Sequence, residues 1–209
     1  MWVVKFGGSL NRDPLLREWL ELVAAHGAGR VVLVPGGGGF ADQVRAHQAH
    51  WGFDDLTAHN MAILAMMQTA MLMQSLAPGL VLATTRGDIE QVLQAGKVAV
   101  WSPASWIRNE AGDMTHWGAS SDSLAAWLAT NLGAAGLVLV KSCPIEPGLS
   151  LRDYTQRGIL DADFCRVAAG AAYPIELLGK SEPARLRALL SLSEGDPRVW
   201  PRDLPGNSR

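Results

Sequence analysis

Lysines are scarce in this chain, and three of the four stand where a predicted strand ends. Lys5, Lys141 and Lys180 each close an apolar run, whereas the chain has fourteen arginines. In open α/β sheets, ligands bind in the crevice outside the carboxyl ends of the strands. A lysine there offers a compact charge on a flexible stem, which suits phosphoryl oxygens. The placement of all three indicates phosphate chemistry, although a stem reaching into water would explain any one of them.

Two glycine turns follow the first two predicted strands. Gly7 and Gly8 lie after the first strand, and Gly36 to Gly39 after the second, each before a predicted helix. Without a Cβ, backbone N–H groups approach an anion closely, and the helix N-terminus adds positive charge. Neither turn fits the spacing of a dinucleotide-binding GxGxxG or a GxxxxGK[ST] loop. The turns therefore favour another kind of phosphate site, and a plain tight turn explains two glycines better than four.

Asp122 lies in the segment HWGASSDSLAAWLATNLGA (116–134), where the pattern places it in the first turn of a helix. An acid is favoured there by the helix dipole alone. Alternatively, the carboxylate faces the strand-end lysines and orients them, or helps to hold a magnesium ion. Since asparagine also caps helices well, we expect Asp122→Asn to change stability little and to lower the rate if the second interpretation holds.

The strands that must position these residues read as short, continuous apolar runs. Such runs are typical of parallel strands buried on both faces. Segments of helical periodicity alternate with them, which predicts an α/β fold with an open, mainly parallel sheet and helices on both faces. We expect one kinase-like domain over 1–195 and an irregular, proline-rich tail over 196–209. The predicted strands are 2–6, 31–35, 80–84, 98–101, 136–141 and 175–178.

Composition excludes several classes of protein. The chain has 209 residues and a net charge of −2, without the basic stripe that a nucleic-acid-binding protein shows. No apolar stretch reaches the length of a membrane span, and we expect no targeting signal at the N-terminus. The two cysteines, Cys143 and Cys165, form neither a disulfide framework nor a zinc motif. We expect a cytoplasmic protein with neither nucleic acid nor membrane as a partner.

A methionine-rich segment and the five histidines leave alternatives open. HNMAILAMMQTAMLMQ (59–74) holds five of the seven methionines, spread over more than one helical face. Such a helix is buried in the core or against a second subunit, which favours a homo-oligomer; a soft wall for a small substrate is the alternative. The histidines show no metal-ligand spacing and fit surface or satisfied core positions. His47 and His50 share one helical face and keep a contact with an acceptor phosphate possible.

The motifs resemble the amino acid kinase family, which includes acetylglutamate, aspartate, uridylate and isopentenyl phosphate kinases. KFGGS at 5–9, PGGGGFA at 35–41, the SSDSLAAWLA helix and VLVKS at 138–142 occur in the order of the family and span residues 1–142. The compact length, WGFDDLTAHNMA, and WGASSDSLAAWLA followed by LVKS are most similar to the small kinases of methanofuran biosynthesis. Those enzymes convert (5-(aminomethyl)furan-3-yl)methyl phosphate to its diphosphate.

The resemblance implies phosphoryl transfer from ATP with Mg²⁺ to a small-molecule phosphate acceptor. By position in the motifs, Lys5 would touch the transferring group, and Asp122 would organise that lysine. Lys141 would add a second catalytic charge on the nucleotide side. No protein residue is assigned as a metal ligand. ATP would contact Gly7, Gly8, Ser9, Ser142 and Lys180, and the acceptor would contact Gly36, Gly37, Gly38, Gly39 and Phe40.

Two departures from the family pattern limit this assignment. Many members carry a second catalytic lysine late in the chain, but the corresponding stretch GILDADF has Asp161 there, so Lys141 or Lys180 would have to supply that charge. KSCPIEPG also replaces the usual Thr-Asp pair after the nucleotide-side strand. A uridylate or isopentenyl phosphate kinase, and a non-catalytic nucleotide-binding or storage protein of the same fold, therefore remain alternatives.

Overall fold

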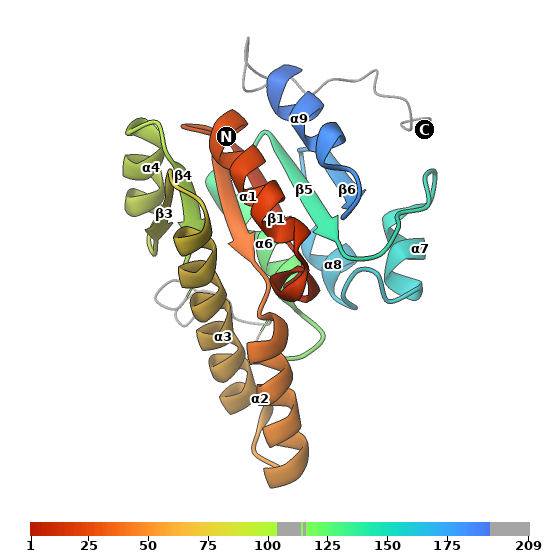
Figure 1. Ribbon diagram of the computed structural model, residues 1–209. Helices are drawn as coiled ribbons and strands as arrows, with labels where there is room; N and C mark the ends of the chain where they lie inside the picture. Colours follow the sequence, from red (N-terminus) through yellow and green to blue (C-terminus); the bar gives the residue numbers. More distant parts are fainter. Residues whose placement is uncertain (104–113, 115, 193–209) are drawn as a thin grey trace.

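A single six-stranded sheet forms the centre of the protein (Figure 1). The computed structural model describes residues 1–103, 114 and 116–192. The strand order is β3-β4-β2-β1-β5-β6, and each neighbouring pair is parallel. This confirms the predicted open sheet, which is parallel throughout in the described chain. The strands are β1 (Trp2–Phe6), β2 (Val31–Pro35), β3 (Leu80–Ala83), β4 (Val98–Trp101), β5 (Gly136–Lys141) and β6 (Ile175–Gly179).

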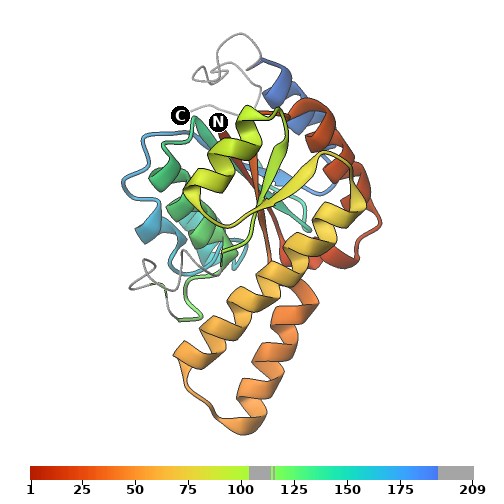
Figure 2. The ribbon, with the colours of Figure 1, turned by 90° about the vertical axis from the view of Figure 1, so that its left-hand side faces the viewer.

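Helices cover both faces of the sheet (Figures 1 and 2). Helices α1 and α9 and the C-terminal part of α3 pack on one face, and α4, α6 and α8 pack on the other. Each face buries its own apolar cluster, as expected for a doubly wound fold. The helices are η1 (Gly8–Arg12), α1 (Leu15–His26), α2 (Gly38–Trp51), α3 (Asp55–Leu76), α4 (Arg86–Gln94), α6 (Ser121–Leu132), α7 (Leu151–Gln156), α8 (Phe164–Val167) and α9 (Pro183–Leu192).

Strand alternation sends two of the strand-end lysines to the same face. In β1, Trp2 and Val4 belong to the cluster on the α1 side and Val3 to the cluster on the α6 side. Because successive side chains alternate between faces, Lys5 points toward α6. The same alternation in the adjacent strand β5 points Lys141 toward α6 as well. The two lysines therefore converge on the N-terminus of α6, at the carboxyl edge of the sheet.

Helices α2 and α3 form an antiparallel hairpin that projects beyond the carboxyl edge of the sheet (Figure 2). Asp54 caps α3 by accepting a hydrogen bond from the Thr57 backbone N–H at 2.7 Å. Of the methionines on α3, Met66 and Met73 are buried in the core, whereas Met71 is 57% exposed. The helix is thus buried on the side that faces the sheet and open on the other.

The predicted domain boundary cannot be placed on this structure. The sheet and its helices occupy the described part of 1–192, while the predicted tail over 196–209 lies outside the described residues. A single domain over 1–195 therefore stays a prediction. Within the described residues, no helix combines the length and apolar character needed to cross a membrane.

Candidate active site

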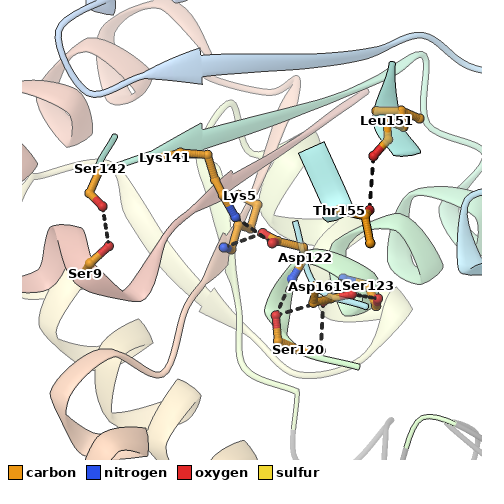
Figure 3. Close-up of polar contacts among 10 residues, drawn as sticks. All are labelled: Lys5, Ser9, Ser120, Asp122, Ser123, Lys141, Ser142, Leu151, Thr155 and Asp161. Atoms are coloured by element: carbon orange, nitrogen blue, oxygen red, sulfur yellow. Dashed lines mark hydrogen bonds and ion pairs between the residues drawn. The ribbon is translucent and has the colours of Figure 1, made fainter. Parts of the chain in front are cut away.

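Two lysines form ion pairs with one buried carboxylate at the carboxyl edge of the sheet (Figure 3). Lys5 Nζ lies 2.6 Å from Asp122 Oδ1, and Lys141 Nζ lies 2.6 Å from Asp122 Oδ2. The three residues come from β1, α6 and β5. Lys5 is 3% exposed and Asp122 is 2% exposed. The trio carries one net positive charge in a site shielded from bulk water, where an anion is strongly attracted.

Burial and the neighbouring lysine charges have opposite effects on the pKa of Asp122. Burial alone would raise the pKa of Asp122, but the charges and hydrogen bonds of Lys5 and Lys141 hold it below its usual value. The pKa of Lys141 is lowered, first by burial and then by the charge of Lys5, although Asp122 and Asp161 oppose this. Asp122 is therefore an anion at neutral pH, fixed between two cationic donors.

Asp161 holds the N-terminus of α6 and thereby positions Asp122 (Figure 3). Its Oδ2 accepts hydrogen bonds from the Ser120 backbone N–H at 2.8 Å, the Ser120 hydroxyl at 2.8 Å and the Ser123 backbone N–H at 3.0 Å. Its Oδ1 accepts from the Ser123 hydroxyl. A carboxylate at a helix N-terminus satisfies free N–H groups and stabilises the helix dipole. The helix start, and with it Asp122, is tied to a segment some forty residues away.

We expect Asp161→Asn to shift the pH profile of activity as well as stability. The amide lacks the negative charge that helps to keep Lys141 protonated, so the pKa of Lys141 should fall further below its usual range. The charged groups around Lys141 are Lys5, Asp122 and Asp161. The alkaline limb of kcat should therefore move to lower pH, and stability should fall by about 1 kcal/mol through the weakened cap. Turnover measured from pH 6 to 10 checks the first effect, and thermal unfolding the second.

Asp153→Asn is the matched control for this experiment. Asp153 caps α7 in a capping box with Ser150 and does not line the cavity that holds the lysines. It should lose cap stability without any shift of the pH limb. A pH profile that is unchanged in Asp161→Asn would show that Asp161 only caps the helix.

The two glycine turns pack against each other, backbone to backbone. A Cβ on Gly8 would lie 2.7 Å from the Gly38 Cα, and a Cβ on Gly36 would lie 2.7 Å from the Gly8 Cα. Gly38 also has a φ of +54°, a left-handed conformation that favours glycine. Close packing between the two turns therefore explains why Gly8 and Gly36 are glycines, without any ligand. The result is that the N-termini of η1 and α2 open side by side beside Lys5.

A cavity of about 760 Å³ surrounds the lysine pair. This is within the range of small-molecule sites. Its wall is formed by α2, α3 and the segment around Trp117, and by Ser142, Cys143 and residues 157–162. Both lysines belong to the same wall. Ser9 and Ser142, joined by a 2.8 Å hydrogen bond between their hydroxyls, also line the wall.

The structure brings together most of the site residues predicted from the sequence. Those that line the cavity are Lys5, Gly7, Gly8, Ser9, Gly37, Gly38, Asp122, Lys141 and Ser142. Four others lie outside its wall: Gly36 and Gly39 pack against Gly8 and Arg12, Phe40 is 44% exposed, and Lys180 forms a 2.6 Å ion pair with Asp13. The geometry lends no support to a binding role for these four. It makes Lys141, and not Lys180, the second cation at Asp122.

Several residues in the cavity wall were not predicted as site residues. These are Arg45, His59, Met66, Trp117 and Asp161. Arg45, His59 and Met66 lie on the two helices that follow the second glycine turn. The helical periodicity of these segments is the sequence signal that could have indicated them. Neither His47 nor His50 lines the cavity; both are exposed on α2. The predicted contact of these two histidines with an acceptor phosphate therefore finds no support.

The donors at the lysine pair fit phosphate oxygens better than they fit a metal ion. Two ammonium groups, two serine hydroxyls and the opening of two helices face one cavity, which suits phosphate oxygens. Both Asp122 oxygens are already bound by lysines, and the described residues contain no cluster of three carboxylate, histidine or cysteine side chains that would hold a metal.

A parallel α/β sheet that presents two lysines on one buried carboxylate at its carboxyl edge has the donors that phosphoryl groups require. The sequence pattern of the amino acid kinase family matches residues 1–144, and this chain belongs to that family of phosphotransferases. This confirms the resemblance found in the motifs. It also confirms the fold expected from them.

The chain is also similar to individual proteins. The chain is 28% identical over 142 residues to a [5-(aminomethyl)furan-3-yl]methyl phosphate kinase of Methanocaldococcus jannaschii, over 66% of this chain and 64% of that protein. Among solved structures, the uridylate kinase of Archaeoglobus fulgidus is 16% identical, with a TM-score of 0.66 over 91% of this chain and 96% of that one. The UMP kinase of Bacillus anthracis is 14% identical, with a TM-score of 0.62 over 91% of each chain. At these identities the two structures show a shared fold.

Proposed function

We propose that this protein transfers the terminal phosphoryl group of ATP to a small phosphomonoester, giving a diphosphate and ADP. The proposed acceptor is (5-(aminomethyl)furan-3-yl)methyl phosphate, in the synthesis of a methanofuran-type cofactor. The observation that carries the proposal is the pair of lysines held on Asp122 in the wall of one cavity. The choice of acceptor is supported by the M. jannaschii relative, whose name gives that substrate.

In the proposed reaction, an oxygen of the acceptor phosphate attacks the terminal phosphorus of ATP, and the bond from that phosphorus to ADP breaks. Such a transfer requires positioning and neutralisation of charge more than covalent help. Lys5 and Lys141 would contact the oxygens of the transferring group from two adjacent strands. Asp122 would hold both ammonium groups in place, so that little reorganisation is needed as charge develops.

The wall of the cavity offers places for the phosphates of two substrates. Gly37 and Gly38 line the wall where α2 begins, so the N-terminus of this 14-residue helix opens toward the cavity. A helix N-terminus binds phosphate well. We assign the acceptor to this part of the wall. We assign ATP, with Mg²⁺ on its phosphates, to the part of the wall that contains Gly7, Gly8, Ser9 and Ser142. We also propose that the enzyme is cytoplasmic.

The test is a screen of acceptors with purified protein and MgATP. ADP production and the mass of the product are measured with the furan phosphate, its unphosphorylated alcohol, uridylate and isopentenyl phosphate. We expect the furan phosphate to give the highest kcat/KM and to yield the diphosphate. The alcohol should be at least ten-fold poorer, because it lacks the phosphate that the N-terminus of α2 would bind.

Each other result has a distinct meaning. A clear preference for uridylate or isopentenyl phosphate would replace the acceptor but keep the reaction. Equal use of the furan phosphate and its alcohol would show that the site does not bind an acceptor phosphate. ATP binding without any acceptor-dependent ADP production would favour the storage alternative and overturn the proposal.

We also propose that the protein assembles as a homo-oligomer through the exposed face of α3. Leu56, Leu64 and Met71, each more than half exposed, recur at spacings of eight and seven residues and so lie on one side of the helix. Met71→Lys should therefore shift the sedimentation coefficient toward the monomer, because a buried apolar seam would have to accept a charge. Gln91→Lys, on the exposed side of α4, is the control that should sediment like the wild type. A wild-type protein that is monomeric at micromolar concentration would contradict the proposal.

A further inference from the structure

One large aromatic side chain stands in the wall of the cavity. Trp117 is half-buried, and among the described residues that line the cavity it is the one phenylalanine, tyrosine or tryptophan. The chain continues from it to Asp122, and the wall also includes Ala119, Ser120, Ser121 and Asp122 itself. The indole ring therefore belongs to the same segment of the wall as the carboxylate that holds the two lysines.

The indole ring is held in place by contacts with α2. Its Nε1–H donates to Gln48 Oε1 at 2.5 Å. The Gln48 amide is itself held, because its Nε2 donates to the Asp55 carboxylate at 2.8 Å and to the Phe53 carbonyl oxygen at 3.2 Å. A ring that is already held in place loses little conformational entropy when a ligand packs on it.

The guanidinium of Arg45 covers one face of the indole. It lies 4.6 Å from the ring centre and forms an ion pair with Asp42 at 2.9 Å. With this face occupied, a planar ligand has the opposite face on which to stack. The polar group of the ring, its N–H, is already bonded to Gln48. Trp117 therefore offers a ligand an apolar aromatic surface and no further hydrogen bond.

Trp117 lies close to the place that we assign to the acceptor. Arg45 follows Gly38, the first residue of α2, by seven residues, which is about 10 Å along a helix. Helical side chains point back toward the N-terminus, which brings the guanidinium and the indole it covers closer to the helix start. A small ester whose phosphate binds at the N-terminus of α2 can therefore place its organic part against the indole.

We propose that Trp117 selects the acceptor by stacking on a planar ring in it. The inference rests on the proposed function, because it requires the acceptor phosphate to bind at the N-terminus of α2. It defines the substrate class as a small phosphomonoester of an aromatic or heteroaromatic alcohol. A branched chain such as that of isopentenyl phosphate does not stack on an indole in this way, and neither does a saturated ring.

The test compares two acceptors that differ in the planarity of one ring. One is (5-(aminomethyl)furan-3-yl)methyl phosphate, and the other is its counterpart with a saturated oxolane ring in place of the furan. We expect the wild type to prefer the furan by about three- to ten-fold in kcat/KM, as stacked aromatic pairs allow. Trp117→Leu should lose this preference through a higher KM for the furan, while the KM for ATP changes less than about two-fold.

Two further variants separate stacking from the structure of the wall. Trp117→Phe keeps an aromatic face and should keep most of the preference. Both Trp117 variants lose the hydrogen bond to Gln48, so a difference between them in the preference reports on the ring alone. Trp51→Leu is the control at a tryptophan that ends α2, is 72% exposed and lies outside the cavity wall. It should behave like the wild type.

Three results would overturn the inference. If the wild type uses the two acceptors equally, no planar ring is recognised. If Trp117→Leu lowers kcat/KM equally for both acceptors, the indole only shapes the wall. If Trp117→Phe loses the preference as fully as Trp117→Leu, the hydrogen bond to Gln48 is responsible and not the face of the ring.

Failure of the proposed function is distinguished by titration calorimetry without ATP, which needs no turnover. Absence of acceptor-dependent ADP with every phosphomonoester would contradict the proposed function. The dissociation constant of the furan phosphate then decides on Trp117 alone. A constant that is the same in the wild type and in Trp117→Leu would contradict the inference as well, whereas weaker binding of the furan but not of the oxolane by the variant would uphold it.

Discussion

Lys5→Met is expected to reduce kcat by at least a hundred-fold and to leave the fold intact. The ammonium of Lys5 is one of the two cations placed where phosphoryl oxygens would lie, and it is preorganised by Asp122 at 2.6 Å. Removing one such preorganised donor typically costs 10²–10³-fold in turnover. Methionine keeps the length of the side chain and its apolar stem, so packing at the end of β1 is preserved. Steady-state kinetics with the preferred acceptor and MgATP measure the loss.

The charge balance explains why the fold should survive this change. After Lys5→Met, Asp122 remains paired with Lys141 at 2.6 Å, so the site holds one anion and one cation. No buried charge is left alone. The thermal midpoint should therefore change little compared with the loss in rate, and circular dichroism should match that of the wild type.

Lys97→Met provides the matched control. Lys97 is exposed, precedes β4 at the amino edge of the sheet and does not line the cavity. This variant should turn over at the wild-type rate. Unchanged turnover in Lys5→Met itself would show that the reaction does not take place at this lysine, and the proposed active site would be wrong.

The sequence was sufficient to predict the strands and the edge of the sheet that carries the site. Six apolar runs gave six parallel strands, because strands buried on both faces have a strong local signal. Lys5 and Lys141 could be placed at strand ends for the same reason. Their convergence on α6 follows from strand alternation once the two strands are known to be neighbours. Lys180, also at a strand end, follows β6 at the outer edge of the sheet and pairs with Asp13 instead.

Contacts between distant segments could not be predicted in the same way. Asp161 reaches Ser120 and Ser123 across about forty residues, and nothing in the local pattern of GILDADF indicates that its carboxylate caps another helix. Likewise, the run Gly36 to Gly39 reads as a single anion-binding loop, although Gly36 is needed for close packing against Gly8. The contact of Trp117 with Gln48 also joins segments that are distant in the sequence.

Asp122→Asn is expected to abolish activity and, unlike Lys5→Met, to destabilise the fold strongly. From the sequence, Asp122 was expected to be replaceable without loss of stability because asparagine also caps helices. The structure shows a different arrangement: Ser120 is the N-cap residue of α6, and Asp122 is 2% exposed between two lysines. The substitution leaves the ammonium groups of Lys5 and Lys141 without the anion that pairs with both. Removing one partner of a buried ion pair costs about 3–5 kcal/mol, and here the remaining charges also repel each other.

The pH dependence of stability gives this prediction a second readout. The pKa of Asp122 in the folded protein is held below the usual 3.8 by Lys5 and Lys141 against the opposing effect of burial. A carboxylate whose pKa is lowered by folding stabilises the protein above its unfolded pKa, and that contribution is lost as the pH falls through the folded value. Wild type and Asp122→Asn should therefore differ most near pH 7 and converge as the pH falls below about 4.

Asp13→Asn separates the special position of Asp122 from the general effect of losing an ion pair with lysine. Asp13 pairs with Lys180 at 2.6 Å outside the cavity wall, so its loss should leave turnover unchanged and stability nearly so. Urea unfolding at pH 7 and at pH 3.5, together with ADP production at pH 7, compares the three proteins. If Asp122→Asn were as stable as the wild type at pH 7, the two lysines could not both be charged beside it. The interpretation that two charged lysines pair with Asp122 would then be wrong. The proposed binding of the transferring phosphoryl group by these lysines would fail with it.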